Sequence, residues 1–146
     1  MRSPQLETPI RLFIGDLKEA ETVQNLMDLV VDCCGLGGDR DNGMAVVPSA
    51  GNHRWAGADL DRIVSAVRPR LMAGERVLLH CRSGRSRSTT AAAAILLAMG
   101  KAATVDQALR LCARNTHLQE GGDAPDRRCA ASLREWWHGR QQPRLF

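Results

Sequence analysis

Residues 77–89 read VLLHCRSGRSRST and join a short apolar run to an alanine-rich stretch. The apolar residues 77–79 predict a buried strand, and the almost wholly apolar stretch 88–99, which stops before Gly100, predicts a buried helix. The polar residues between them then form a loop that leads from a strand end into a helix start. Backbone N–H groups of such a loop converge on one spot, where the helix dipole adds positive potential. The segment therefore predicts an anion-binding site.

The side chains of this loop suit phosphate chemistry. Cys81 follows the strand directly, where a positive field would favour its thiolate and lower its pKa. Arg87 falls at the helix start and can place its forked guanidinium on two phosphate oxygens. Ser88 can hydrogen-bond the sulfur, and His80 can support the loop through a backbone contact. Gly84 permits backbone conformations that a side chain would forbid.

Strand and helix patterns alternate on both sides of the loop. Short apolar runs predict strands at residues 10–14, 29–34, 44–47 and 77–79. Helical spacing of apolar residues predicts helices at 18–29, 59–71, 88–99, 105–114 and 130–137. This alternation predicts an α/β fold, with a central, mostly parallel, twisted sheet of four or five strands and helices on both faces. No repeat or linker interrupts the pattern, so residues 1–146 are expected to form one domain with its core at about 8–138.

The charge of the chain points to anionic partners. The formal net charge is +4, and 18 of the 20 basic residues are Arg, which is the residue best suited to bidentate phosphate recognition. An Arg-rich proteome would produce the same excess, so composition alone decides little. There is no Tyr, and only two Phe and three Trp occur. This scarcity argues against a nucleic-acid partner, because single-stranded nucleic acid is bound by stacking on aromatic rings.

The five cysteines are odd in number, and their spacing matches no zinc pattern. Nothing near Met1 resembles a signal peptide, and the longest apolar stretch, Thr89 to Met99, is too short to span a bilayer. These features predict a cytoplasmic protein with free thiols, without a membrane span and without a bound metal.

The letters HCRSGRSRS at residues 80–88 fit H-C-x-x-G-x-x-R-[ST], the signature of the cysteine-dependent protein tyrosine phosphatases. The Gly-x-Ser-Arg-Ser ending most resembles the dual-specificity branch. A weaker similarity extends over about residues 8–138. The resemblance implies the dual-specificity phosphatase fold and hydrolysis of phosphate monoesters through a phosphocysteine on Cys81, with no metal and no cofactor. The implied substrate is a phosphorylated protein or another phosphate ester.

The resemblance also assigns roles within the loop. Cys81 is the implied nucleophile, and Ser88 assists the sulfur as nucleophile and leaving group. The backbone amides and the Arg87 guanidinium hold the charge of the transition state. The implied substrate-binding residues are Arg82, Ser83, Gly84, Arg85, Ser86 and Arg87.

One part of the family pattern is missing. Dual-specificity phosphatases carry their general acid, an Asp, in the loop after the strand that precedes the long helix. The corresponding position here falls near Ala50, and residues 48–57 contain no Asp or Glu. The first candidate for the acid is His53, which can donate a proton at neutral pH. The other candidates, in order, are Asp123 or Asp126, Asp59, and no dedicated acid at all.

Other functions stay open. Arg82 and Arg85 lie at positions similar to those that hold Lys in phosphoinositide-directed and inositol-pyrophosphate-directed relatives. Extra cations there favour a substrate with several phosphates, such as an inositol polyphosphate or a phosphoinositide. An RNA 5′-triphosphate is a further possibility, since some related enzymes lack the usual acid. The missing Asp also fits a weakly active phosphate-binding module.

Cys33 and Cys34 end the predicted strand 29–34. In some relatives a cysteine there forms a reversible disulfide with the nucleophile. The simpler interpretation is that both are small buried residues.

Overall fold

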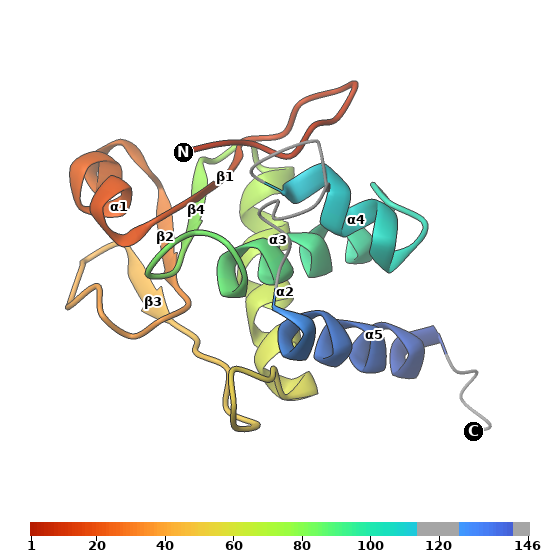
Figure 1. Ribbon diagram of the computed structural model, residues 1–146. Helices are drawn as coiled ribbons and strands as arrows, with labels where there is room; N and C mark the ends of the chain where they lie inside the picture. The colour runs from red at the N-terminus through yellow and green to blue at the C-terminus, as the bar shows by residue number, and fades with distance from the viewer. Residues whose placement is uncertain (114–125, 142–146) are drawn as a thin grey trace.

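A four-stranded, wholly parallel sheet lies at the centre of the structure (Figure 1). The computed structural model describes residues 1–113 and 126–141. The strands are β1 (Leu12–Gly15), β2 (Leu29–Asp32), β3 (Gly43–Ala45) and β4 (Val77–His80), arranged in the order β1-β4-β2-β3. The predicted α/β architecture is confirmed, with the smaller of the two expected strand numbers.

Helices cover both faces of the sheet, but unequally. They are α1 (Leu17–Val23), followed by a 3-10 turn (Gln24–Leu26), then α2 (Gly57–Met72), α3 (Arg87–Ala98), α4 (Val105–Cys112) and α5 (Arg127–Gln141). On one face, α1 and the turn cover a small apolar cluster of Ala20, Met27, Val30 and Leu78. Helices α2 to α5 enclose the main core on the other face.

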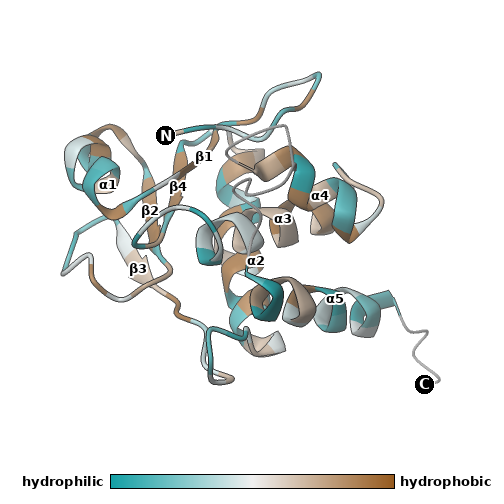
Figure 2. Ribbon diagram, viewed as in Figure 1, coloured by the Kyte–Doolittle hydropathy of each residue, from teal (hydrophilic) through white to brown (hydrophobic). Residues whose placement is uncertain are grey.

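Helix α3 is the centre of the main core. Every residue from Ser88 to Leu97 is buried, as expected of a helix that is apolar on almost all sides (Figure 2). It packs against β4 and β1 and also contacts α2, α4 and α5. The short alanine side chains at 91–94 allow these close approaches. Its N-terminus is thereby fixed at the carboxyl end of β4.

Element boundaries differ most in the first third of the chain. The expected helix 18–29 is shorter, because α1 ends at Val23 and β2 already begins at Leu29. Its start is set by Asp16, whose Oδ1 accepts a hydrogen bond from Glu19 N at 2.7 Å while Glu19 Oε1 accepts one from Asp16 N at 3.0 Å. Within residues 1–113 and 126–141, no helix is long and apolar enough to cross a membrane.

Candidate active site

The loop between β4 and α3 lies at the carboxyl edge of the parallel sheet, the edge at which α/β proteins bind ligands. Cys81 follows β4, and Arg87 is the first residue of α3. Gly84 has φ +70°, and a Cβ there would lie 3.0 Å from the backbone C and O of Gly15. A side chain would therefore collide with the β1–α1 junction. The same junction holds the loop through Leu17 N, which donates to Arg82 O at 3.3 Å.

The Cys81 sulfur lies at the bottom of this loop. The residue is only 1% exposed. Its Sγ accepts a hydrogen bond from Gly84 N at 3.2 Å and lies 3.2 Å from Ser88 Oγ. Burial by itself would raise the pKa of the thiol. Hydrogen bonds from the Ser88 side chain, from the Ser88 and Gly84 backbone, and the charge of Arg87 outweigh that effect and lower the pKa.

This environment predicts selective alkylation of one cysteine. The reactive species is the thiolate, so the rate with iodoacetamide should rise with pH and reach its midpoint below that of free cysteine in the same buffer. Peptide mass mapping after partial alkylation would measure it. Cys112 is an internal control, because burial raises the pKa of its thiol to about 12 and it should stay unmodified. A Cys81 midpoint at or above that of free cysteine would contradict the prediction.

The other polar side chains of the motif surround the sulfur. Arg82, Ser83 and Arg85 are exposed at the rim of the loop. Arg87 is half-buried, and no ion pair among the described residues involves it. The Ser86 hydroxyl accepts a hydrogen bond from Asp126 N at 2.8 Å, which joins the loop to the start of α5. The arrangement leaves a cationic rim above a buried thiol.

His80 lies beneath the loop on the α1 side of the sheet. Its ring is fully buried, with Nε2 at 3.1 Å from Arg40 Nη1 and 3.8 Å from Asp32 Oδ1. A guanidinium only donates, so Nε2 accepts and the proton of the neutral ring resides on Nδ1. Burial lowers the pKa of His80, which keeps the ring neutral at physiological pH. Its main-chain carbonyl accepts from Cys33 N at 2.7 Å, so both the ring and the backbone hold the strand end in place.

Asp32, Cys34 and His80 form the one group of metal-type ligands that lie within 4.8 Å of one another among the described residues. The Asp32 carboxylate is already occupied, because Oδ1 accepts from Cys34 N, Cys34 Sγ and Gly35 N, and Oδ2 accepts from Gly37 N. These bonds outweigh burial and lower the pKa of Asp32. The Arg40 guanidinium stands against the His80 ring, and a second cation there would be repelled. The group is thus a hydrogen-bonded support for the strand ends and a poor metal site.

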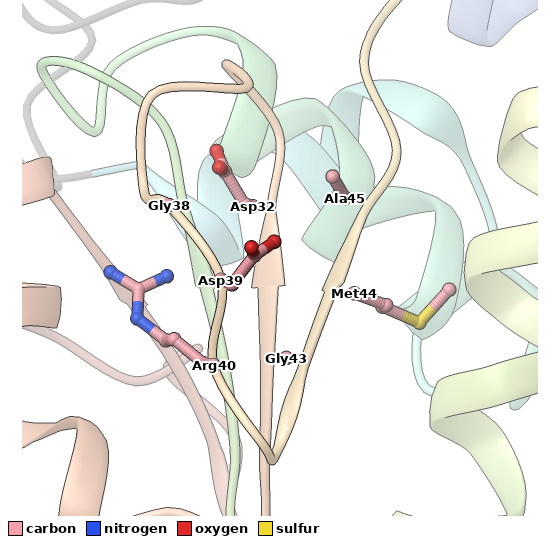
Figure 3. Close-up of a pocket in the computed structure, with 7 residues that line it drawn as sticks. All are labelled: Asp32, Gly38, Asp39, Arg40, Gly43, Met44 and Ala45. Atoms are coloured by element: carbon pink, nitrogen blue, oxygen red, sulfur yellow. The ribbon is translucent and has the colours of Figure 1, made fainter.

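A cavity of about 110 Å³ opens beside this support (Figure 3). It is lined by Asp32, Gly38, Asp39, Arg40, Gly43, Met44 and Ala45. None of the loop residues 81–88 lines it, so this hollow is separate from the Cys81 site.

Asp59 is engaged away from the loop, at the start of α2. Its Oδ2 accepts hydrogen bonds from Ser49 N (3.0 Å), Ser49 Oγ (2.7 Å) and Ala56 N (3.0 Å). The residue is buried. The carboxylate therefore braces the segment in which the family places its acid.

His53 and Asp126 lie closer to the loop. His53 is exposed, with φ 62°, and its carbonyl accepts the Cys129 thiol at 3.1 Å. Asp126 meets the loop through its own N–H and begins α5, where its Oδ1 accepts from Arg128 N at 2.7 Å. Hydrogen bonds from the Arg128 backbone and side chain lower the pKa of Asp126, and the charge of nearby His53 adds to the effect. Asp123 lies outside the described residues.

The five cysteines are free thiols. Burial raises the pKa of Cys33 well above its usual range, and the charge of nearby Cys81 raises it further. The Cys34 thiol donates to Asp32 Oδ1 at 3.2 Å, and burial raises its pKa to about 11. The disulfide between Cys81 and one of these residues stays a prediction.

Three polar residues of the site were missed in the sequence. Asp32 and Arg40 act beneath the loop, and Arg2 bonds to it from the N-terminal segment. Asp32 carries a recognisable signal, a carboxylate at the end of an apolar strand, but the strand was predicted to run on to residue 34. Arg2 and Arg40 carry no local signal, because each contacts residues far along the chain.

No protein-family model and no curated protein matches this sequence. Solved structures match it over most of its length. Human DUSP28 is 19% identical with a TM-score of 0.71, over 90% of this chain and 97% of that one. A mouse putative dual specificity phosphatase complexed with zinc tungstate is 19% identical with a TM-score of 0.72, over 97% and 95% of the two chains. PTPMT1 in complex with PI(5)P is 16% identical with a TM-score of 0.68, over 88% and 90%. This chain therefore has the fold shared by the dual-specificity-like members of the cysteine-dependent protein tyrosine phosphatase superfamily.

Proposed function

We propose that this protein hydrolyses phosphate monoesters through a phosphocysteine intermediate on Cys81, as a dual-specificity protein phosphatase. One observation carries the proposal: a buried thiol of lowered pKa accepts a hydrogen bond from a loop N–H where that loop enters helix α3. A structural cysteine in an apolar core has its pKa raised, as Cys112 does. The fold of the solved phosphatases supports the same reaction.

The reaction has two displacements at phosphorus. In the first, the Cys81 thiolate forms an S–P bond, the P–O bond to the alcohol breaks, and an acid protonates the leaving oxygen. In the second, water forms a P–O bond, the S–P bond breaks, and inorganic phosphate leaves while the thiolate is restored. The amides of residues 82–87 and the Arg87 guanidinium bind the equatorial oxygens in both steps. Ser88 Oγ, at 3.2 Å from the sulfur, stabilises the departing thiolate.

His53 is the group we assign as acid. Asp59 is bound to Ser49 and Ala56, and the lowered pKa of Asp126 keeps that carboxylate ionised at neutral pH. Asp126 can then act on His53 by charge, because the two lie close enough to interact electrostatically. An imidazolium beside a carboxylate is a competent proton donor near neutral pH.

Replacing the acid should affect substrates selectively. His53→Ala should lower kcat on phenyl phosphate, whose leaving group is poor, by about 10²-fold. It should change kcat on para-nitrophenyl phosphate little, because that leaving group departs without a proton. Steady-state kinetics on the pair would show this, with Asp126→Asn as the comparison variant. Equal losses of His53→Ala on both esters would overturn the assignment.

A second candidate substrate class is a polyphosphorylated inositol or phosphoinositide. Arg82 and Arg85 place two exposed guanidinium groups next to Arg87 at the rim. The structurally similar PTPMT1 has been solved with PI(5)P. Loss of both arginines' charge would weaken a second phosphate contact more than a single one.

A substrate panel tests the proposal. Phosphotyrosine and phosphoserine peptides, an inositol polyphosphate, PI(5)P and triphosphate-ended RNA would be compared, with Cys81→Ser as the blank. Acid quenching followed by peptide mass mapping should find phosphate on the peptide that holds Cys81. Arg85→Ala should then weaken turnover of the inositide substrates alone if they are the true class. Turnover of none of these substrates would leave a phosphate-binding module.

Location and domain extent belong to the same proposal. The free thiols at all five cysteine positions fit the reducing cytoplasm. The chain would act as one catalytic domain, since the loop is braced by both the N-terminal segment and α5.

A further inference from the structure

The N-terminal segment runs along β1 and crosses to α4 (Figure 1). Arg2 N donates to Ile14 O at 2.9 Å, and Ile14 N donates to Arg2 O at 2.7 Å, which closes an antiparallel bridge at the sheet edge. Gln5 N donates to Leu111 O at 2.9 Å. Directly paired residues on neighbouring strands project to the same face of a sheet. Because Ile14 is buried in the main core, the Arg2 side chain enters the α3 side of the sheet.

The Arg2 guanidinium connects three separate parts of the fold. Nη2 donates to Gly84 O at 2.8 Å and to Thr89 Oγ1 at 2.6 Å. Nε donates to Cys112 O at 2.9 Å. Cys112 ends α4, where carbonyls lack helical partners and a positive charge is favourable. The phosphate loop, the first turn of α3 and the end of α4 are therefore held by one side chain.

The bond to Gly84 O fixes the direction of a loop amide. Gly84 O and the N–H of Arg85 belong to the same peptide unit. In a trans peptide these two groups point in opposite directions. Arg2 holds the carbonyl on the outer side of the loop, so the Arg85 N–H faces the inner side, towards the anion position. Gly84 has φ +70°, and glycine leaves many orientations open to the peptide that follows it.

The contacts of Gly84 O show how much of this orientation depends on Arg2. The only other bond to the carbonyl among the described residues comes from Thr89 Oγ1, at 3.3 Å. That hydroxyl is itself bound by Arg2 at 2.6 Å. Removing the guanidinium would thus loosen both partners of the carbonyl. The Gly84 N–H belongs to the preceding peptide and donates to Cys81 Sγ, so the sulfur would keep its bond.

We propose that Arg2 is a positioning residue for oxyanion binding, acting through the Gly84–Arg85 peptide. It lies behind the loop and does not touch the substrate. The inference rests on the proposed function, because it assumes that an oxyanion occupies the loop. It adds a residue from the N-terminal segment, outside the motif, on which phosphate affinity depends.

Calorimetric titration with tungstate tests the proposal without turnover. Arg2→Met removes all three bonds and should weaken tungstate affinity about tenfold, the worth of one charge-assisted hydrogen bond. Arg2→Lys keeps the charge but cannot fork, so it should fall between Arg2→Met and wild type. Arg11→Met is the matched control, because Arg11 is an exposed residue of the same segment, and its affinity should equal that of wild type.

A thiol measurement separates positioning from general damage to the fold. The alkylation midpoint of Cys81 should stay at the wild-type value in Arg2→Met, because its partners Ser88 and Gly84 N are not bound by Arg2. Unchanged tungstate affinity in Arg2→Met would overturn the proposal, whatever its melting temperature. If that variant does not fold, wild-type affinity in Arg2→Lys would overturn it equally. Failure of the wild type to bind tungstate would instead refute the proposed function.

Discussion

The variant Cys81→Ser should lose at least about 10⁴-fold in kcat on para-nitrophenyl phosphate, falling to the level of buffer alone. A serine hydroxyl is not ionised at neutral pH, and the N–H of Gly84 and the charge of Arg87 cannot lower its pKa far enough to change that. Binding should survive, because the loop amides and Arg87 are untouched. Steady-state kinetics would measure the loss, and calorimetry with tungstate would show the retained affinity.

A second cysteine provides the control for that experiment. Cys34→Ser replaces one S–H donor by an O–H donor, so its bond to Asp32 can be kept, and kcat should remain within about threefold of wild type. The phosphocysteine mechanism would be refuted if Cys81→Ser retained more than about a hundredth of wild-type activity. It would also be refuted if labelled phosphate were trapped on another residue.

The order of strands and helices could be predicted from sequence because the signals are local. The fully apolar run 77–79, the loop with Gly84 and the alanine-rich stretch after Arg87 each specify their own conformation. The structure places β4, the loop and α3 at these residues, with Gly84 at φ +70°. Helix α1 was predicted too long, because its apolar spacing continues into Met27, which packs in the small cluster beside β2 in extended backbone.

The support of the loop could not be predicted, because it is made of contacts between distant segments. The Arg2 guanidinium meets Gly84 and Cys112, and the Arg40 guanidinium meets the ring of His80. A single arginine in a sequence rich in arginine shows nothing of such a partner. The excess of Arg in the composition is thus explained in part by buried roles that differ from phosphate contact.

The acid is the part of the site where sequence and structure together narrow the choice. The sequence left four residues and a fifth option without an acid. The Asp59 carboxylate is bound by Ser49 and Ala56, which fits a brace at the start of α2 better than a proton donor. The resemblance to the family located the expected position near Ala50, but it could not say which group replaces the Asp.

Arg87→Lys is expected to lower kcat/KM by about 10²- to 10³-fold, the loss typical of removing a transition-state hydrogen-bond donor. Lysine keeps the positive charge but loses the planar fork that matches two equatorial phosphate oxygens. No ion pair among the described residues engages Arg87, so the guanidinium is available to the oxyanion. Kinetics on para-nitrophenyl phosphate would measure the change, with Arg110→Lys on the exposed side of α4 as the matched control.

The pH profile decides whether Arg87 acts on the phosphate or only on the thiol. Its charge lowers the pKa of Cys81, after the larger contributions of Ser88 and Gly84. Arg87→Met should therefore raise the alkylation midpoint of Cys81, whereas Arg87→Lys should leave it near wild type. Well above that midpoint the thiolate is fully formed in every variant, so any loss that persists there belongs to the phosphate contact. An Arg87→Lys variant within about threefold of wild type at such a pH would show that charge suffices, and it would refute bidentate binding.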